Sequence, residues 1–289
     1  MKKPLKENRT LGIALIALIY LAAGALGILV FCVLPYDWWV SLLIADVAAT
    51  VFVFLFSLFF KNASVYDPYW SVQPPVILIA LATGAGVNGY GVLLLSVVLL
   101  WAIRLTVNWG YTFHSFLYED WRYRMLREKT GVFYPVINFV GIHMVPTLVV
   151  YAATLPAAYA ILHGVPLVVP SALALLLCVF AVLLETVSDV TMHAYRRHRD
   201  APFCRHGIWR YSRHPNYLGE ILFWWGIALS VVIAVPHAYY LALGAFLNTA
   251  LFLFVSIPMA DRRQSRKEGF AAYQAETRVL FPIPKHHKQ

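Results

Sequence analysis

The sequence predicts an all-α membrane protein, a polytopic helical bundle with about eight transmembrane helices. The chain has 289 residues, of which 61% are hydrophobic and 13% are charged. Its mean hydropathy of +0.68 is too high for an ordinary soluble domain. Its apolar residues form long continuous runs rather than the alternating ten-residue segments of a transmembrane barrel. Helices are then the remaining way to satisfy the backbone in lipid.

Eight apolar runs are candidates for spans, and the third is short. They cover residues 11–34, 38–60, 75–87, 91–113, 132–162, 166–190, 216–235 and 238–259. The first run is longer than the apolar part of a signal peptide and shows no small-residue cleavage site, so we interpret it as a helix. We predict one membrane domain over residues 1–289. It comprises an additional N-terminal helix (1–36), a seven-helix core bundle (37–259) and a cytoplasmic tail (260–289).

The positive charge of the chain is one-sided. Its net charge is +9. If the N-terminus with Lys2, Lys3 and Lys6 lies in the cytoplasm, all 23 Lys and Arg residues except Arg104 fall in cytoplasmic segments. The turns near residues 35, 86, 164 and 236 contain none. This pattern follows the positive-inside rule and explains the charge without nucleic acid. We expect an integral protein of the bacterial inner membrane with both termini in the cytoplasm.

Two other sequence features do not predict a site. Residues 84–89 fit the pattern G-x-G-x-x-G, but no strand precedes them, so they predict a glycine-rich turn rather than a dinucleotide fingerprint. Cys32, Cys178 and Cys204 are too few and too scattered for a disulfide framework, and Cys204 with His206 does not make a zinc site. We expect neither a disulfide nor a metal.

The most informative stretch is residues 207–226, where a basic and aromatic loop runs into an apolar helix. Pro215 suits the first helical turn, because its φ is fixed and its missing N–H would be unpaired there anyway. Asn216 and Glu220 are four residues apart and share a helical face. An ionisable group inside an apolar span is costly, so Glu220 is a functional candidate.

A polar stripe precedes this stretch. Glu185, Asp189, His193 and Arg197 follow one another at steps of four and so line one helical face. Two acids at this depth repel each other unless they are protonated or hydrogen-bonded. The stripe is therefore expected to face a wet cavity.

Arginines follow the stripe in a segment that contains one acid, Asp200. They are Arg196, Arg197, Arg199, Arg205, Arg210 and Arg213. Guanidinium groups bind phosphates in a bidentate way, so the segment could hold several phosphates. The alternative is attraction to anionic lipid, with Arg210, Arg213 and His214 anchoring a helix end at the headgroups.

The N-terminal half has candidates of its own. Asp67 lies in the proline-rich segment 61–75, and it is a candidate proton donor if desolvation beneath the helices raises its pKa. Its aromatic neighbour Tyr69 also suits an interfacial belt. Asp46 is an acid within the second span, for which a packing or water contact is as good an explanation as catalysis.

Arg104 and Asn108 share a face of the fourth span, although Arg104 could also snorkel to the headgroups. Arg122 and Arg124 could bind phosphate or belong to a surface helix near Glu119 and Asp120. After the last span, residues 260–273 form a candidate amphipathic helix. This helix would lie on the membrane or fold beneath the bundle and close the phosphate site.

Tyr211, Asn216, Gly219 and Glu220, together with the stripe and the tail as far as Pro282, resemble the membrane steroid 5-alpha-reductase superfamily. The resemblance is greatest to its poorly characterised bacterial branch and covers about residues 40–285. It implies a helical bundle that binds NADPH from the cytoplasmic side. Such a protein would transfer hydride to an activated double bond of a steroid or similar lipid.

The resemblance also implies individual roles. Asp189 matches a cofactor-binding acid, Arg196 matches a phosphate-binding arginine, and Asn216 and Glu220 match polar groups beside the nicotinamide. Tyr273 belongs to a tail that covers the cofactor. Asp67 takes the place of an acid that polarises the substrate carbonyl.

The chain departs from the superfamily pattern at two positions. Trp101 replaces a tyrosine that assists the acid, and Glu185 stands where an asparagine is expected. These changes put a 3-keto-4-ene steroid substrate in doubt and leave Tyr69 or Tyr111 to supply the hydroxyl.

From the residues and the resemblance we predict catalytic roles for Asp67, Tyr69 and Glu220. The residues predicted to bind the cofactor are Arg104, Asn108, Arg122, Arg124, Asp189, Arg196, Arg197, Arg210, Tyr211, Arg213, His214, Asn216, Tyr217, Arg263 and Tyr273.

Two other functions stay open. Membrane methyltransferases that use S-adenosylmethionine share the Arg-His-Pro-x-Tyr-x-Gly run seen at residues 213–219, but they usually carry a later Glu-Glu pair where this chain has Asp261-Arg-Arg. A non-enzymatic lipid-binding or transport protein would also explain the buried acids, although no two-half symmetry is visible.

Overall fold

The computed structural model describes residues 7–198 and 201–285, so Lys2, Lys3, Lys6, Arg199 and Asp200 lie outside the described residues. Within these ranges the chain is helical and contains no strand, which confirms the all-α prediction. The chain divides into two compact units, Met1–Gly164 and Val165–Gln289. We describe each unit by itself.

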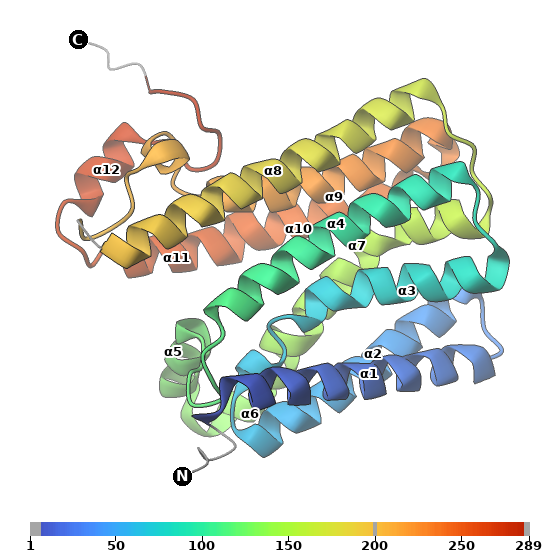
Figure 1. Ribbon diagram of the computed structural model, residues 1–289, viewed down its shortest axis with the longest axis horizontal. Coiled ribbons are helices and arrows are strands. Elements are labelled where there is room, and N and C mark those ends of the chain that lie inside the picture. The colour runs from blue at the N-terminus through green and yellow to red at the C-terminus, as the bar shows by residue number, and fades with distance from the viewer. Residues whose placement is uncertain (1–6, 199–200, 286–289) are drawn as a thin grey trace. The chain divides into compact units, whose positions relative to one another are not determined.

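Unit 1 contains five long helices and several shorter helical turns (Figure 1). The elements are α1 (Arg9–Val33), α2 (Trp38–Phe60), η2 (Ala63–Val65), α3 (Tyr69–Ala85), α4 (Gly89–Thr112), α5 (Trp121–Thr130), η3 (Gly131–Phe133), α6 (Tyr134–Ile137), η4 (Asn138–Met144) and α7 (Val145–Leu162). Helix α1 packs along α2, while α3 packs against both α4 and α7.

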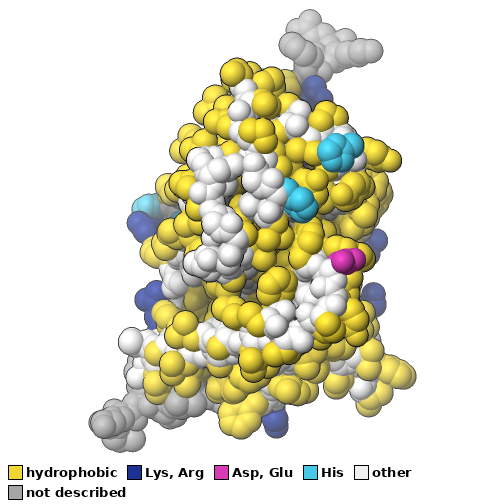
Figure 2. All heavy atoms as spheres, turned by 90° about the vertical axis from the view of Figure 1, so that its right-hand side faces the viewer, with side chains coloured by type: hydrophobic (Ala, Val, Ile, Leu, Met, Phe, Trp, Pro, Cys, Tyr) yellow, Lys and Arg dark blue, Asp and Glu magenta, His cyan; other side chains and the backbone are white. Residues whose placement is uncertain are grey.

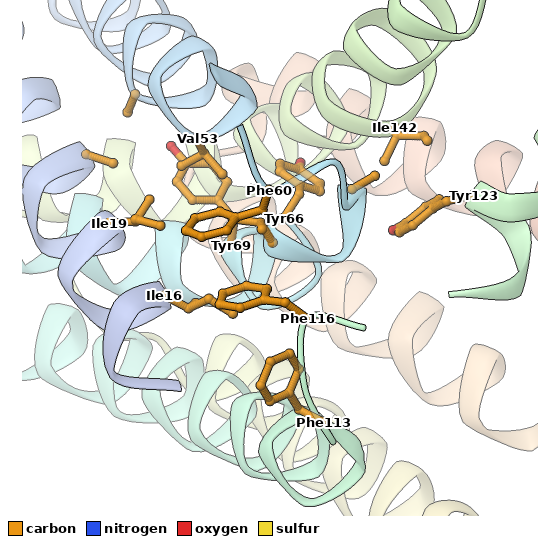
Figure 3. Packing of buried hydrophobic residues seen from close by; sticks show 14 of the residues in the cluster. Ile16, Ile19, Val53, Phe60, Tyr66, Tyr69, Phe113, Phe116, Tyr123 and Ile142 are labelled. Carbon is orange, nitrogen blue, oxygen red and sulfur yellow. The ribbon is translucent and has the colours of Figure 1, made fainter. Parts of the chain in front are cut away.

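Aromatic side chains fill the core of unit 1 where α1, α2 and the segment after α4 meet (Figure 3). The rings of Phe60 and Phe116 stack with centroids 4.5 Å apart. Asn62 ties the same region together, because its Nδ2 donates to the carbonyls of Phe116 at 2.8 Å and Tyr118 at 2.9 Å. The segment between α2 and α3 is therefore a fixed turn, as its prolines and polar residues indicated.

The third predicted span begins earlier than expected. Helix α3 starts at Tyr69 and holds Pro74 and Pro75 in its interior, where both are buried. The sequence predicts a start near Pro75, with Pro74 in the preceding loop, since an interior proline removes a helical hydrogen bond. Proline is better tolerated in membrane helices, where neighbouring groups satisfy the freed backbone. The helix ends at Ala85 and Gly86 has a φ of +79°, so the predicted glycine-rich turn is confirmed.

Two π-helical segments each end just before a proline. Asn138–Met144 precedes Pro146, and Phe252–Ser256 precedes Pro258. A proline cannot donate to the carbonyl four residues earlier, and a π segment is one way in which a helix absorbs the mismatch. The helix before Pro146 therefore contains a wider helical turn.

Unit 2 contains two long helices, α8 and α9, that run side by side (Figure 1). Its elements are α8 (Val169–His198), η5 (Gly207–Arg210), α9 (Pro215–Ala234), η6 (Pro236–Ala242), α10 (Leu243–Leu251), η7 (Phe252–Ser256), α11 (Ile257–Gln264) and α12 (Phe270–Glu276). The predicted helix over residues 260–273 is wrong as one element, because the chain breaks between α11 and α12. Gly269, with a φ of +75°, supplies the left-handed residue that starts α12.

Glycines allow α8 and α9 to approach closely. A Cβ on Gly219 would lie 2.9 Å from the carbonyl oxygen of Ala181 and against the Glu185 side chain. A Cβ on Gly226 would lie 3.1 Å from the carbonyl oxygen of Ala174 and against the Cys178 thiol. Small residues at a crossing let helix backbones pack without a side chain between them, which is a common device in membranes.

In the part of the chain that the structure describes, seven helices are long and apolar enough to cross a membrane, which identifies an integral membrane protein. The third predicted span corresponds to α3, which has 17 residues and is not one of these seven. Figure 2 shows one face of the molecule, and its side chains are mostly hydrophobic, with Lys and Arg visible only towards the edges. Along the long helices, exposed apolar side chains such as Leu21, Leu55 and Leu173 suit contact with lipid.

The crossing of α8 and α9 generates a test. In Gly226→Ala the added methyl meets backbone atoms of α8, which cannot move aside cheaply, so we expect a loss of about 1–3 kcal/mol in the free energy of unfolding. Thermal unfolding of the purified protein in detergent would show a fall of several degrees. Gly110→Ala is the matched control, because a Cβ there meets nothing within 4 Å. Equal unfolding temperatures for the two variants would contradict the close approach.

Candidate functional site

The predicted site residues divide between the two units. Unit 2 holds the residues from Asp189 onward, on α8, on the segment after it, on α9, and on α11 and α12. Unit 1 holds the catalytic candidates Asp67 and Tyr69 and the basic candidates Arg104, Arg122 and Arg124, together with Asn108. We take unit 2 first, because it contains most of the predicted cofactor-binding residues.

Helix α9 begins at Pro215, as the sequence predicts. Asn216 lies in the first turn and Glu220 lies one turn further, where only 6% of it is exposed. Trp224 Nε1 donates to Glu220 Oε1 at 2.8 Å, so the carboxyl group has a fixed orientation. The Oδ1 atom of Asn216 is buried and has no hydrogen-bond partner within residues 7–198 and 201–285. This oxygen is suited to accept a hydrogen bond from a ligand.

The polar stripe on α8 runs from a buried end to an exposed end. Glu185 is 1% exposed and lies against Gly219 of α9, between the levels of Asn216 and Glu220. Asp189 and His193 are half-buried, and Arg197 is exposed. The helix therefore brings its acids to the polar face of α9 and its cations to an accessible end.

Arg213 and His214 both bind Asp261 of α11. Arg213 Nη2 lies 3.2 Å from Asp261 Oδ2, and His214 Nε2 lies 2.9 Å from Oδ1. Arg213 Nη1 also donates to the carbonyl of Thr277 at 3.1 Å. Arg213 and His214, which were both predicted to bind the cofactor, thus join the start of α9 to α11, and Arg213 also reaches the segment after α12. The His214 ring also stacks on Tyr217, with centroids 5.1 Å apart.

The sequence did not predict the role of Asp261. It stands directly before Arg262 and Arg263, and it looked like one charge on an amphipathic surface helix. The available signal was its position directly after the last predicted span, where an acid can pair with the basic motif upstream.

The segment after α12 pairs with the loop that leads into α9. The backbone N–H of Arg213 donates to Arg278 O at 3.0 Å, and that of His214 donates to Val279 O at 3.1 Å. Tyr273 of α12 donates its hydroxyl to the carbonyl of Trp209 at 2.5 Å. Burial raises the pKa of Tyr273, which keeps the phenol protonated as a donor. The tail therefore folds onto the basic loop within unit 2.

Accessible cations remain beside this docked tail. Arg196, Arg197, Arg210 and Arg263 are exposed, and Tyr211 is 39% exposed. Arg210 lies 5.9 Å from the centre of the Tyr211 ring. These groups are the ones that can reach a phosphate without first breaking a buried pair.

In unit 1, Asp67 accepts a hydrogen bond from the Tyr123 hydroxyl at 2.5 Å. Burial, and next the nearby charge of Asp120, raise the pKa of Asp67 to about 7. The carboxyl group therefore changes its protonation state near neutral pH, which suits a proton donor. This pKa shift is what the sequence led us to expect if the loop folded beneath the helices.

Tyr69 is oriented differently from Asp67. Its hydroxyl donates to Asp46 Oδ1 at 3.4 Å, and its ring lines a cavity beside α1 and α2. Of the two tyrosines considered as the missing hydroxyl, Tyr69 is buried, whereas Tyr111 is 52% exposed. Trp101, which stands where the superfamily has a tyrosine, is fully buried against Trp70 and has no hydroxyl group.

The basic candidates of unit 1 have local contacts. Arg122 Nε binds Asp120 Oδ1 at 2.8 Å, and Arg124 lies 6.0 Å from the centre of the Tyr118 ring. These contacts match the alternative of a surface helix near Glu119 and Asp120. Arg104 and Asn108 are half-buried on α4.

Comparison with known proteins places these observations in a family. Residues 53–277 match the model of the family described as "Protein of unknown function (DUF1295)". The chain is 26% identical over 258 residues to the Schizosaccharomyces pombe protein named "Uncharacterized protein C594.04c", with 78% of this chain and 74% of that protein covered. No solved structure matches. With most of both units inside the matched range, the chain belongs to the DUF1295 family, which is related to steroid 5-alpha-reductase-like membrane proteins.

Proposed function

We propose that this protein is an NADPH-dependent membrane reductase of a carbon–carbon double bond in a steroid, sterol or similar lipid. The observation that carries the proposal is the arrangement in unit 2. Unit 2 contains a buried Asn216 oxygen that has no partner among the described residues, and exposed arginines lie at the end of α8 and before α9. The relation of the family to steroid 5-alpha-reductase-like proteins supports the same reading.

The residues present fit such a cofactor. A nicotinamide carboxamide brings N–H donors, and Asn216 Oδ1 is a buried acceptor with no partner among the described residues. Arg196, Arg197 and Arg210 would hold the phosphates, and Asp189 would accept from a ribose hydroxyl. The bound dinucleotide would supply the hydride. Glu220, fixed by Trp224, would orient the ring from the buried side.

Asp67 in unit 1 is proposed to act as a proton donor. Because Tyr123 donates to Oδ1, a proton held by the carboxyl group sits on the other oxygen, Oδ2. A pKa of about 7 lets this group hold a proton and release it under ordinary conditions. We propose a bacterial inner membrane as the location, with both termini in the cytoplasm, on the one-sided distribution of Lys and Arg.

Loss of the accessible arginines is expected to weaken NADPH binding. Each charge-assisted hydrogen bond contributes about 1.5–3 kcal/mol, so Arg196→Gln combined with Arg197→Gln should raise the Kd for NADPH about tenfold or more. Isothermal titration or ligand-induced thermal stabilisation measures this change. Arg266→Gln, an exposed cation in the turn after α11, is the control. Stabilisation of the wild type by S-adenosylmethionine but not by NADPH would identify a methyltransferase instead.

Asn216 tests the nicotinamide contact directly. Asn216→Leu removes the Oδ1 acceptor, and that atom has no hydrogen-bond partner among the described residues, so the fold should keep its unfolding temperature within a few degrees. Turnover of NADPH with an enone lipid should fall about tenfold or more, because the donor of the bound ring then lacks a partner. Unchanged turnover together with unchanged NADPH affinity would remove Asn216 from the site.

The raised pKa of Asp67 predicts that the stability of the protein depends on pH. This pKa is raised in the folded state, so the folded protein binds more protons than the unfolded chain between about pH 4 and pH 7. The contribution of this group to stability is thus greatest at low pH and is lost as pH rises through 7. Asp67→Asn keeps an acceptor for Tyr123 and should flatten the decline in unfolding temperature between pH 5 and pH 8.

The control for this measurement is Asp37→Asn, since Asp37 is exposed and makes no capping hydrogen bond to α2. It should keep the wild-type pH profile. A decline of the same steepness in Asp67→Asn as in the wild type would show that another group titrates, and Asp67 would lose its assignment as the proton donor.

A further inference from the structure

Unit 1 contains a cavity of about 210 Å³ between α1, α2 and α3. Its walls are mostly apolar and include Ala23, Gly27, Leu42, Ala49, Ile77 and Leu81. The wall from α1 and the near part of α2 precede residue 53, so they lie outside the range that matches the family model. Protein interiors are close-packed, and an empty apolar space of this size forfeits many dispersion contacts. A bound molecule would restore them.

One end of the cavity is polar. Asp46 is 5% exposed and accepts hydrogen bonds from Gln73 Nε2 and from the Tyr69 hydroxyl. Gln73 is also 5% exposed. The structure places Gln73 Nε2 against the carboxyl group of Asp46, and the oxygen Oε1 is the other end of the amide.

The second amide atom, Gln73 Oε1, is buried and has no hydrogen-bond partner in the part of the chain that the structure describes. Buried polar atoms are nearly always paired, so this acceptor calls for a donor from something else in the cavity. The Tyr20 hydroxyl, which also lines the cavity, already donates to the carbonyl of Val65 at 2.5 Å. Within the described residues, Gln73 Oε1 is thus an acceptor at the polar end that lacks a hydrogen-bond donor.

The opposite end of the cavity reaches the surface of unit 1. The lining residues Ile28, Cys32 and Gly84, near the ends of α1 and α3, are exposed and uncharged. Gly24 helps to keep this route wide, because a Cβ there would meet only Val76 Cγ1, at 3.8 Å. An occupant can therefore enter from the surface of unit 1 at this end without passing charged groups among the lining residues.

We propose that this cavity binds a lipid alcohol. Its apolar body would lie along α1 and α3, and its hydroxyl would donate to Gln73 Oε1. A ketone or aldehyde brings no donor and would leave that oxygen unpaired, at a cost in affinity. This inference concerns binding alone and does not depend on the proposed reduction.

The test uses the full chain in detergent without NADPH, so its outcome is separate from that of the reductase proposal. The probes are farnesol and farnesyl methyl ether, which share the apolar body and differ in the hydroxyl donor. Native mass spectrometry and thermal stabilisation should show saturable binding of one farnesol per chain. The ether should bind about tenfold more weakly, because it leaves the buried acceptor unpaired.

Variants locate the site. Gln73→Leu should remove the difference between the two probes. Gly24→Leu should abolish saturable binding of both, whereas Ala25→Leu on the exposed side of the same helix should bind as the wild type does. Should Gly24→Leu not fold, Val76→Trp blocks the same route from α3. Equal affinity for the two probes in the wild type, or wild-type binding in a blocked variant, overturns the proposal. So does the absence of saturable farnesol binding.

Discussion

The carboxylate of Asp261 holds unit 2 together at its polar end. It binds Arg213 and His214 at once, and those two residues directly precede Pro215 at the start of α9. Its side chain is 17% exposed and that of Arg213 is 10% exposed, so removing either partner would leave a largely buried charge. The direction of α9, and with it the position of Asn216 and Glu220, follows from this contact.

The two units handle polar groups in different ways. In unit 1, tyrosines and threonines pair in the interior, as where the hydroxyls of Tyr66 and Thr147 lie 2.8 Å apart. Such neutral pairs can be buried without a net charge. In unit 2, an acidic face is buried and cations are kept at its accessible end. Unit 1 is suited to hold an apolar molecule by shape, and unit 2 is suited to hold an anion by charge.

Local rules predicted the elements that carry the candidate site. Pro215 marked the start of α9, and the four-residue spacing from Glu185 placed the stripe on one face of α8. The sequence did not predict which residues these side chains contact. Asp261 is 47 residues from His214, and Tyr69 meets an acid 23 residues away because of how α2 and α3 are rotated about their axes. Periodicity specifies which residues share a face, but not what that face meets. The start of α3 was missed for another reason, since two adjacent prolines outweighed an apolar run that tolerates them.

The narrow crossing of α8 and α9 also gives the protein a built-in chemical reporter. The Cys178 thiol lies beneath Gly226, is 0% exposed and points to the carbonyl of Phe223 at 3.4 Å. Cys32, in contrast, is exposed on α1. In detergent, a maleimide dye would therefore attach to Cys32 faster than to Cys178, which reacts only when the two helices move apart. The alkylation rate of Cys178 then measures how often α8 and α9 separate locally while the rest of the chain stays folded.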